Sequence, residues 1–279
     1  MRRQSLLCFC FLCLLVSTLL SLPCFAAPTT LQMQSPAAEQ VQISPPMRRA
    51  EPPSPTASGE DLEVRGDELR AEKSYFDALD YYRAALVKKP NSPQIYNKAG
   101  IAELMTQHFR EAGKHFERAI RMDRTYADAY NNLGVIDYES KRYGRAIKRY
   151  KQAIEIQASS ASFFSNLGAA YFAKKDFVQA SISYARALQL DPAVFDRTSH
   201  SGISAQLASP ADRAHYDYVL AKLFAKIGAA ERSLQYLRKA MEEGYKNVND
   251  VYKDPEFAVL RKDSRFTELM AAKPQAIPE

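Results

Sequence analysis

The sequence predicts an all-α protein built from a repeated pair of helices, and two observations support this prediction. The first is a 34-residue interval that relates several columns of small or aromatic residues. The columns are Gly66, Gly100, Gly134 and Gly168; Tyr75, Phe109, Tyr143 and Phe177; Ala78, Ala112, Ala146 and Ala180; Tyr82, Phe116, Tyr150 and Tyr184; and Ala85, Ala119, Ala153 and Ala187. The second is proline, which from residue 59 to residue 191 occurs only at Pro90 and Pro93, where turns are expected. We expect the small residues where helices cross closely, with the rings filling the wider gaps.

A 34-residue unit with these columns resembles the tetratricopeptide repeat (TPR), a helix–turn–helix unit. The best copy spans residues 161–194 and has that family's aromatic, Leu-Gly, Tyr, Ala, aromatic, Ala and Pro pattern at Phe164, Leu167, Gly168, Tyr171, Ala180, Tyr184, Ala187 and Pro192. The resemblance implies a TPR α-solenoid, a right-handed superhelix whose regular part, 59–194, comprises units 59–92, 93–126, 127–160 and 161–194. Each first helix should meet the second helix of its own unit and the first helix of the next, so that the units are stable as a stack.

The rest of the helical region departs from the regular spacing. Leu220, Ala221, Phe224, Gly228, Ser233, Leu237 and Ala240 indicate a degenerate fifth unit at 214–247. Residues 195–213 are then an insertion loop, either functional or simply mobile, although Ser209-Pro210 favours a helix start near its end. Residues 248–279 resemble the closing segment of TPR arrays. Phe257, Leu260, Phe266 and Leu269 should cover the apolar edge of the last repeat, with a separate partner site as the alternative.

The first 58 residues predict export. Arg2 and Arg3 precede an apolar run over residues 6–22, which is typical of a signal peptide, here residues 1–26. An uncleaved membrane anchor is the alternative, because the run is at the lower limit for spanning a bilayer. All four cysteines lie in the first 24 residues, so a cysteine-free mature chain fits a periplasmic or secreted location. Residues 27–58 are rich in proline and predict a disordered linker, or else a ligand for a proline-binding domain.

No residue pattern supports catalysis or a cofactor. Phosphate-binding glycine loops and the serine-hydrolase and zinc-protease motifs are absent, and the mature chain has no cysteine nucleophile. His108 and His115 lie on either side of a turn, and His200 and His215 lack metal-ligand spacing, so no metal is expected. The net charge of +6 does not by itself imply nucleic acid. We therefore predict a protein that is not an enzyme.

The resemblance to TPR proteins implies a concave groove on the first helices that binds a peptide or an amphipathic helix of a partner protein. The groove residues would be Asn97, Ile101, Leu104, Met105, Asn131, Val135, Tyr138, Ser165 and Phe172. Glu63 and Asp67 stand where the family's carboxylate clamp has Lys and Asn, which disfavours binding of chaperone tails. Alternatively, the strip of residues is common to the repeat whatever it binds, or is covered by the insertion or the proline-rich segment.

A basic patch gives a second hypothesis. It comprises Lys141, Arg142, Arg145, Lys148, Arg149 and Lys151, with no acid between them. The resemblance places most of them on the outer surface of the third unit, where they would bind anionic lipid or an acidic protein, or simply be solvated. We thus predict an exported adaptor or assembly factor, with a structural or membrane-surface protein of the envelope as the alternative.

Overall fold

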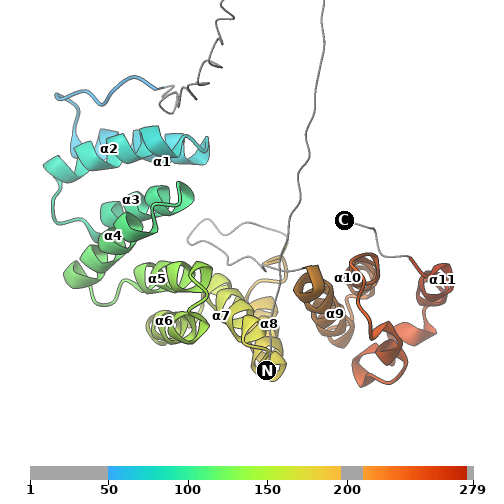
Figure 1. The fold of residues 1–279 in the computed structure, drawn as a ribbon. Coiled ribbons are helices and arrows are strands. Elements are labelled where there is room, and N and C mark those ends of the chain that lie inside the picture. Colours follow the sequence, from blue (N-terminus) through green and yellow to red (C-terminus); the bar gives the residue numbers. More distant parts are fainter. Residues whose placement is uncertain (1–49, 196–209, 275–279) are drawn as a thin grey trace, which may run out of the picture. The chain divides into compact units, whose positions relative to one another are not determined.

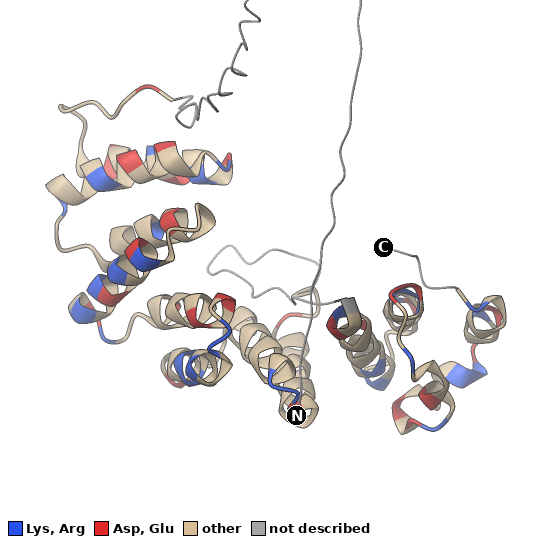
Figure 2. Cartoon of the chain, in the orientation of Figure 1, with Lys and Arg blue, Asp and Glu red and all other residues tan. Residues whose placement is uncertain are grey.

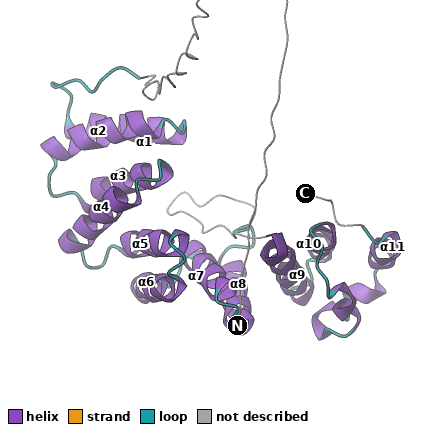
Figure 3. Cartoon of the chain, in the orientation of Figure 1, coloured by secondary structure: helices purple, strands orange, loops and turns teal. Residues whose placement is uncertain are grey.

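The computed structural model describes residues 50–195 and 210–274, all within Pro46–Glu279, the second of two units into which the chain divides. The predicted signal peptide or anchor, residues 27–49 of the linker, residues 196–209 of the insertion and residues 275–279 lie outside the described residues. In the described ranges every regular element is a helix and there is no strand (Figure 1; Figure 3). The all-α prediction is confirmed.

The helices follow one another in antiparallel pairs. The regular pairs are α1 (Gly59–Ala71) with α2 (Tyr75–Lys88), α3 (Pro93–Met105) with α4 (Phe109–Met122), α5 (Ala127–Glu139) with α6 (Tyr143–Ile156), and α7 (Ala161–Ala173) with α8 (Phe177–Leu190). A further pair, α9 (Pro210–Lys226) and α10 (Ala230–Glu242), precedes three 3-10 turns and a last helix, which are η1 (Val248–Tyr252), η2 (Pro255–Phe257), η3 (Leu260–Lys262) and α11 (Ser264–Ala272).

Local sequence signals start and close these pairs. Ser58 Oγ accepts a hydrogen bond from the amide of Asp61, and Ser92 Oγ accepts one from Ile95, so both serines cap a first helix. Each regular pair turns through a residue with a positive φ, and these residues are Lys73, Gln107, Lys141 and Lys175. Gly228 has the same role between α9 and α10. A left-handed residue is thus a further column of the repeat, with Lys in three of the four regular units and Gln in the second.

The glycine column lies where the two helices of a pair cross. A Cβ atom on Gly66 would lie 2.6 Å from Cε1 of Tyr82, and one on Gly134 would lie 2.5 Å from Cε1 of Tyr150. Phe116 and Tyr184 approach Gly100 and Gly168 in the same way. Because these rings are buried directly over the glycine backbone, no larger residue fits without displacing them, as the sequence columns predict.

Consecutive units pack mainly through the second helix of one and the first helix of the next. Ala85 of α2, for example, shares a buried cluster with Ile95 and Ala99 of α3. Contacts between successive first helices are also present, as expected, but they are fewer. The reason is that α2 lies against both α1 and α3 and buries a side of each.

The end of the predicted linker is ordered, which corrects the expectation that all of residues 27–58 would be disordered. Ala50 and Ala57 pack against the first core cluster. The Tyr81 hydroxyl donates a hydrogen bond to the Glu51 carbonyl at 3.0 Å, and Lys88 Nζ donates one to the Pro55 carbonyl at 3.1 Å. Proline removes backbone donors but leaves the carbonyls, and side chains of α2 bind these carbonyls.

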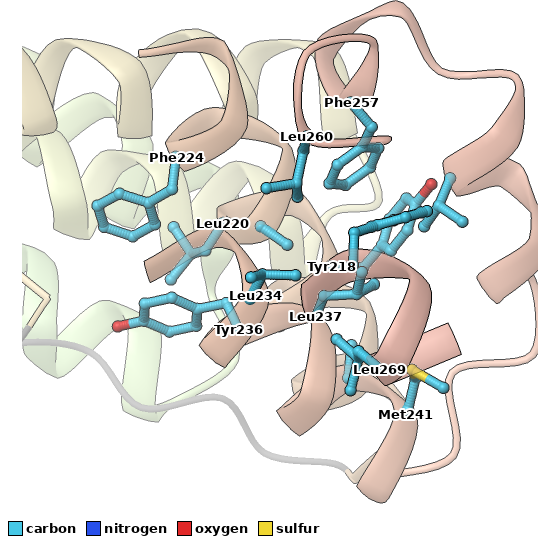
Figure 4. Close-up of a cluster of buried hydrophobic side chains, with 14 of the residues drawn as sticks. Tyr218, Leu220, Phe224, Leu234, Tyr236, Leu237, Met241, Phe257, Leu260 and Leu269 are labelled. Atoms are coloured by element: carbon cyan, nitrogen blue, oxygen red, sulfur yellow. The ribbon is translucent and has the colours of Figure 1, made fainter. Parts of the chain in front are cut away.

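The last pair is continuous with the closing segment. Helix α9 begins at Pro210, so residues 210–213 of the predicted insertion loop are helical. Phe257, Leu260 and Leu269 are buried in one cluster with side chains of α9 and α10 (Figure 4), and Phe266 belongs to the same cluster. Phe257 and Leu260 lie on 3-10 turns rather than on an α-helix. These residues cover the apolar side of the last pair.

Candidate partner-binding surfaces

The nine predicted groove residues lie on α3, α5 and α7, and most of them are interior. Met105 is 42% exposed and Ser165 is partly buried. The others are buried, namely Asn97, Ile101, Leu104, Asn131, Val135, Tyr138 and Phe172. The Phe172 ring contacts those of Phe177 and His215 at centroid distances of 5.0 and 5.2 Å. These side chains therefore hold helices together and offer a partner little surface.

The predicted amide contacts are made within the chain. Asn132 Nδ2 donates to Asn97 Oδ1 at 3.0 Å, and Asn166 Nδ2 donates to Asn131 Oδ1 at 3.0 Å. Asn131 Nδ2 also donates to Asn132 Oδ1 at 3.2 Å. All four residues are buried, so the bonds form an asparagine ladder that joins α3, α5 and α7. The sequence signal for this ladder is a 35-residue interval between asparagines on successive first helices. It is easily missed because the repeat columns have an interval of 34 residues.

The acids at the clamp positions are neutralised by the next unit. Lys98 Nζ lies 2.6 Å from Glu63 Oε1 and 2.6 Å from Asp67 Oδ2. The Tyr82 hydroxyl donates to Asp67 Oδ1 at 2.8 Å, and burial together with this bond raises the pKa of Tyr82 well above its ordinary value. Acids therefore occupy the place of the required cations, which disfavours binding of a carboxylate tail.

The basic patch lies on α6 and on the turn before it (Figure 2), and ion pairs partly neutralise it. Asp137 is buried, and its Oδ1 lies 2.8 Å from Arg142 Nε and 3.4 Å from Arg145 Nε. Lys141, Lys148 and Lys151 remain exposed. The sequence stretch itself has no acid, so this pairing appears only when α5 and α6 are packed together.

The structure adds a groove that sequence reasoning missed. A cavity of about 560 Å³ lies between α8 and α9, with η1 and η2 at one edge. Val178 and Ile182 of α8 line it and are 70% and 57% exposed. Leu223 of α9 lines it from the other side. We call this the α8–α9 groove. The signal that could have found it is a pair of apolar residues four apart on an outer helix face.

Aromatic rings also line the α8–α9 groove. The centroids of Phe177 and His215 are 4.2 Å apart, and those of Tyr218 and Tyr245 are 4.3 Å apart. Burial, with Lys175 nearby, lowers the pKa of His215, so its ring is neutral at pH 7. His215 is therefore a partly buried ring that packs against other aromatic side chains. His200 lies outside the described residues.

Residues 50–195 and 210–274 offer neither a metal site nor a membrane span. No group of His, Cys, Asp and Glu in these ranges could hold a metal ion. His108 pairs instead with the buried carboxylate of Glu103, with Nδ1 2.7 Å from Oε2. None of the helices in these ranges combines the length and the apolarity that crossing a bilayer requires.

Known proteins share this geometry. Family models described as TPR repeat and tetratricopeptide repeat match residues 135–175 and 161–194. No curated protein matches the chain. A solved structure of pilF from Pseudomonas aeruginosa is 18% identical, with a TM-score of 0.50, and the match covers 77% of this chain and 97% of that one.

Two other solved structures are similar at lower TM-scores. MamA from Desulfovibrio magneticus RS-1 is 16% identical with a TM-score of 0.46, over 66% of this chain and 94% of that one. The first TPR of Spaghetti (RPAP3), bound to the HSP90 peptide SRMEEVD, is 19% identical with a TM-score of 0.37, over 46% of this chain and 94% of that one. Taken with the helix pairs and their glycine column, the family models show that this chain contains tetratricopeptide repeats and has the TPR helix–turn–helix fold.

Proposed function

We propose that the chain is an exported protein-interaction module, an adaptor or assembly factor that binds a peptide or an amphipathic helix of another protein. One observation carries the proposal. The polar side chains that first helices could offer to a small ligand, such as Asn97, Asn131 and Lys98, are bonded within the array, whereas large apolar side chains such as Val178 and Ile182 stay exposed. A surface of this kind favours a protein partner over a small polar ligand.

Export is supported by the sequence alone. The basic start, the apolar run over residues 6–22 and the confinement of cysteine to the first 24 residues all fit a chain that acts outside the cytosol, in the periplasm or beyond. Sequencing the N-terminus of the mature protein distinguishes a cleaved signal peptide from an anchor. A mature chain that begins near Ala27 supports cleavage, and one that begins at Met1 supports the anchor.

The alternative is a membrane-surface protein of the envelope, and the exposed Lys141, Lys148 and Lys151 favour it. Flotation with anionic vesicles at low and high salt tests this alternative, because charge-driven binding weakens as salt rises. The double variant Lys148→Glu, Lys151→Glu should then lose binding. Its control is Lys246→Glu, Lys262→Glu, which makes the same charge change at exposed positions outside the basic patch.

The test of the adaptor function is capture of envelope proteins by the tagged full chain, followed by reconstitution with the purified candidate. We expect saturable one-to-one binding that persists at high salt, since the exposed contact residues are apolar. If the captured proteins match those retained by an unrelated helical protein of equal net charge, the adaptor function is wrong.

A further inference from the structure

The α8–α9 groove carries an apolar stripe that the repeat does not require. Val178, Ile182 and Ala185 lie on one face of α8, at i, i+4 and i+7, and all three line the groove. One repeat earlier, on α6, the same positions are Gly144, Lys148 and Lys151, and on α4 they are Arg110, Lys114 and Glu117. Because α4 and α6 fold with charged or small residues there, the stripe on α8 has a purpose other than the packing of its own pair.

The stripe is open because the fourth and fifth units meet sparsely. The second helix of each earlier unit packs extensively against the first helix of the next, but α8 and α9 make the fewest contacts of any consecutive units. The chain between Phe195 and Pro210 interrupts the regular step at this point. Leu223 and Val219 of α9 form the facing wall of the groove.

The dimensions and spacing of the groove suit a helix. Positions i, i+4 and i+7 span about 10 Å, or two turns, at about 1.5 Å per residue. Apolar anchors at this spacing are how an amphipathic helix packs its own apolar face into a groove. The cavity of about 560 Å³ is bounded by two helices and open to solvent along the exposed side chains of Val178 and Ile182.

One edge of the groove is acidic. Asp250, Asp254 and Glu256 line the groove together with two lysines, Lys222 and Lys226, and Lys253 Nζ lies 3.5 Å from Asp250 Oδ1. Lys222 Nζ lies 2.9 Å from Asp254 Oδ2. Burial opposes ionisation of Asp254, but hydrogen bonds from Lys222 and Tyr218 prevail and lower its pKa. Asp254 is therefore charged at pH 7, while the nearby His215 adds no positive charge.

Glu256 is the acid of this edge with the longest internal ion pair. Its Oε2 is buried and has no hydrogen-bond donor in the described residues, and Lys222 Nζ is at the longer ion-pair distance of 3.6 Å. The Glu256 side chain is 28% exposed, so its carboxylate remains accessible to a cation of a partner on the side away from Lys222. Because the acids of the lining outnumber its lysines, the groove favours a cationic side chain and disfavours an anionic membrane as the occupant.

We propose that the α8–α9 groove binds a two-turn amphipathic helix of a partner protein, whose apolar face covers Val178, Ile182 and Leu223 and whose flanking Lys or Arg pairs with Glu256. This proposal rests on the proposed function in so far as the ligand is a protein. It names the site and the chemistry of the partner, which the proposed function leaves open.

Synthetic helical peptides test the proposal without knowledge of the partner. The probe is a fluorescent amphipathic peptide with Leu at i, i+4 and i+7 and Lys on one flank, and its control has Glu in place of each Lys. Fluorescence anisotropy with the full chain should show the basic peptide binding at least tenfold more tightly than the acidic one. Equal binding of the two peptides, or no binding of either, would overturn the proposal.

Variants of the chain test whether the peptide binds in the α8–α9 groove. Ile182→Lys introduces the residue that α6 has at this position, and because Ile182 is 57% exposed the helix content should not change. We expect it to weaken binding of the basic peptide tenfold or more. Ile156→Lys, at an exposed isoleucine of α6, is the matched control and should bind as the wild type does. Glu256→Gln should remove most of the preference for the basic peptide.

The outcomes separate this proposal from the proposed function. If the peptide binds Ile182→Lys as tightly as the wild type, the groove assignment is wrong, while capture of a partner by the full chain still decides the adaptor function. If anionic vesicles, rather than peptides, bind in a manner that Ile182→Lys abolishes, the groove binds lipid and the proposal fails.

Discussion

The four regular units and the fifth unit fill the same helix crossing in different ways. In the regular units a glycine lies beneath a ring, as Gly134 does beneath Tyr150. In the fifth unit the corresponding residues are Ala221 and Leu237, both fully buried, and Ser233 Oγ donates to the Ala221 carbonyl at 2.7 Å. A larger residue on one helix is matched by a smaller one on the other. The crossing thus requires a roughly constant combined volume rather than particular side chains.

The fifth unit also departs at two other positions of the repeat. The fourth residue of each regular unit's first helix is apolar or aromatic, as at Leu62, Tyr130 and Phe164, whereas the fifth unit has Asp217 there. Its turn residue is Gly228, where the regular units have Lys or Gln. Compared with the regular units, the fifth unit therefore has glycine at the left-handed turn position, where glycine is unstrained, and a buried carboxyl group at the fourth position.

The largest expected effect tests this buried carboxyl group. Burial, and secondarily Glu243, raises the pKa of Asp217 from 3.8 to about 7, despite Lys239 and Arg213 nearby. A carboxyl group whose pKa is higher in the folded state stabilises the fold fully below pH 3.8 and loses that contribution as pH rises to about 7. Relative to the wild type, Asp217→Asn should therefore gain stability between pH 4 and pH 7.5, on the order of 3 kcal/mol.

Denaturant unfolding of both proteins across this pH range measures the difference. The control is Asp123→Asn, because hydrogen bonds from Thr125 lower the pKa of Asp123 and its contribution is constant above pH 5. A difference between Asp217→Asn and the wild type that does not change with pH would show that Asp217 titrates normally and that the fifth unit holds no buried acid.

The next effect concerns the crossing itself. Gly134→Ala should lower the free energy of unfolding by about 2 kcal/mol, because the added Cβ meets the Tyr150 ring. The double variant Gly134→Ala, Tyr150→Leu copies the fifth unit and should recover part of this loss in a double-mutant cycle. Gly144→Ala is the control, since a Cβ there meets nothing within 4 Å and alanine is the better helix former. Additive effects of the two substitutions would contradict the constant-volume interpretation.

The fold was predictable because its constraints recur within the sequence. Gly66 and Tyr82 mean little alone, but their repetition at the same interval indicates that a small residue and a ring meet at every crossing. The ordering of residues 50–58 was not predictable from composition, since it depends on donors from Tyr81 and Lys88, about 30 residues away in the chain. The proline content of this segment shows that backbone N–H donors are missing, but it does not show that the remaining backbone carbonyls can accept hydrogen bonds from side chains.

The candidate site was less predictable for a related reason. Position in the repeat identified Asn97 and Asn131 as surface amides, but their burial depends on Asn132 and Asn166, which bond to them from the next helix. The α8 stripe, by contrast, was visible in the sequence. Comparing Ile182 with Lys148, one repeat earlier, shows a charged position that has become apolar.

A smaller effect is expected from the ring hydroxyl, which, within the described ranges, is unpaired in the fourth unit and hydrogen-bonded in the first. Tyr184 Oη is buried and finds no hydrogen-bond partner in the described part of the chain, and the second unit has Phe116 at this position. Tyr184→Phe should therefore raise the free energy of unfolding by about 1 kcal/mol, since it removes a buried unpaired group. Tyr82→Phe should lower it by about the same amount, because the Tyr82 hydroxyl binds Asp67 and Arg70. Thermal unfolding that moves in the same direction for both variants would contradict this account.

The smallest expected change in stability comes from exchanging the turn residues of a regular unit and the fifth unit. Gln107 has a φ of 63° and Gly228 a φ of 78°, a region that costs residues with a Cβ atom about 1 kcal/mol. Gln107→Gly should stabilise the regular turn by somewhat less than this, because glycine also makes the unfolded chain more flexible. Gly228→Gln should destabilise the fifth unit by about 1 kcal/mol, and chemical denaturation of the pair gives both signs. If Gly228→Gln leaves the free energy of unfolding unchanged, glycine is no better suited to this turn than glutamine is. The fifth unit would then differ from the regular units in its packing and not in its turn.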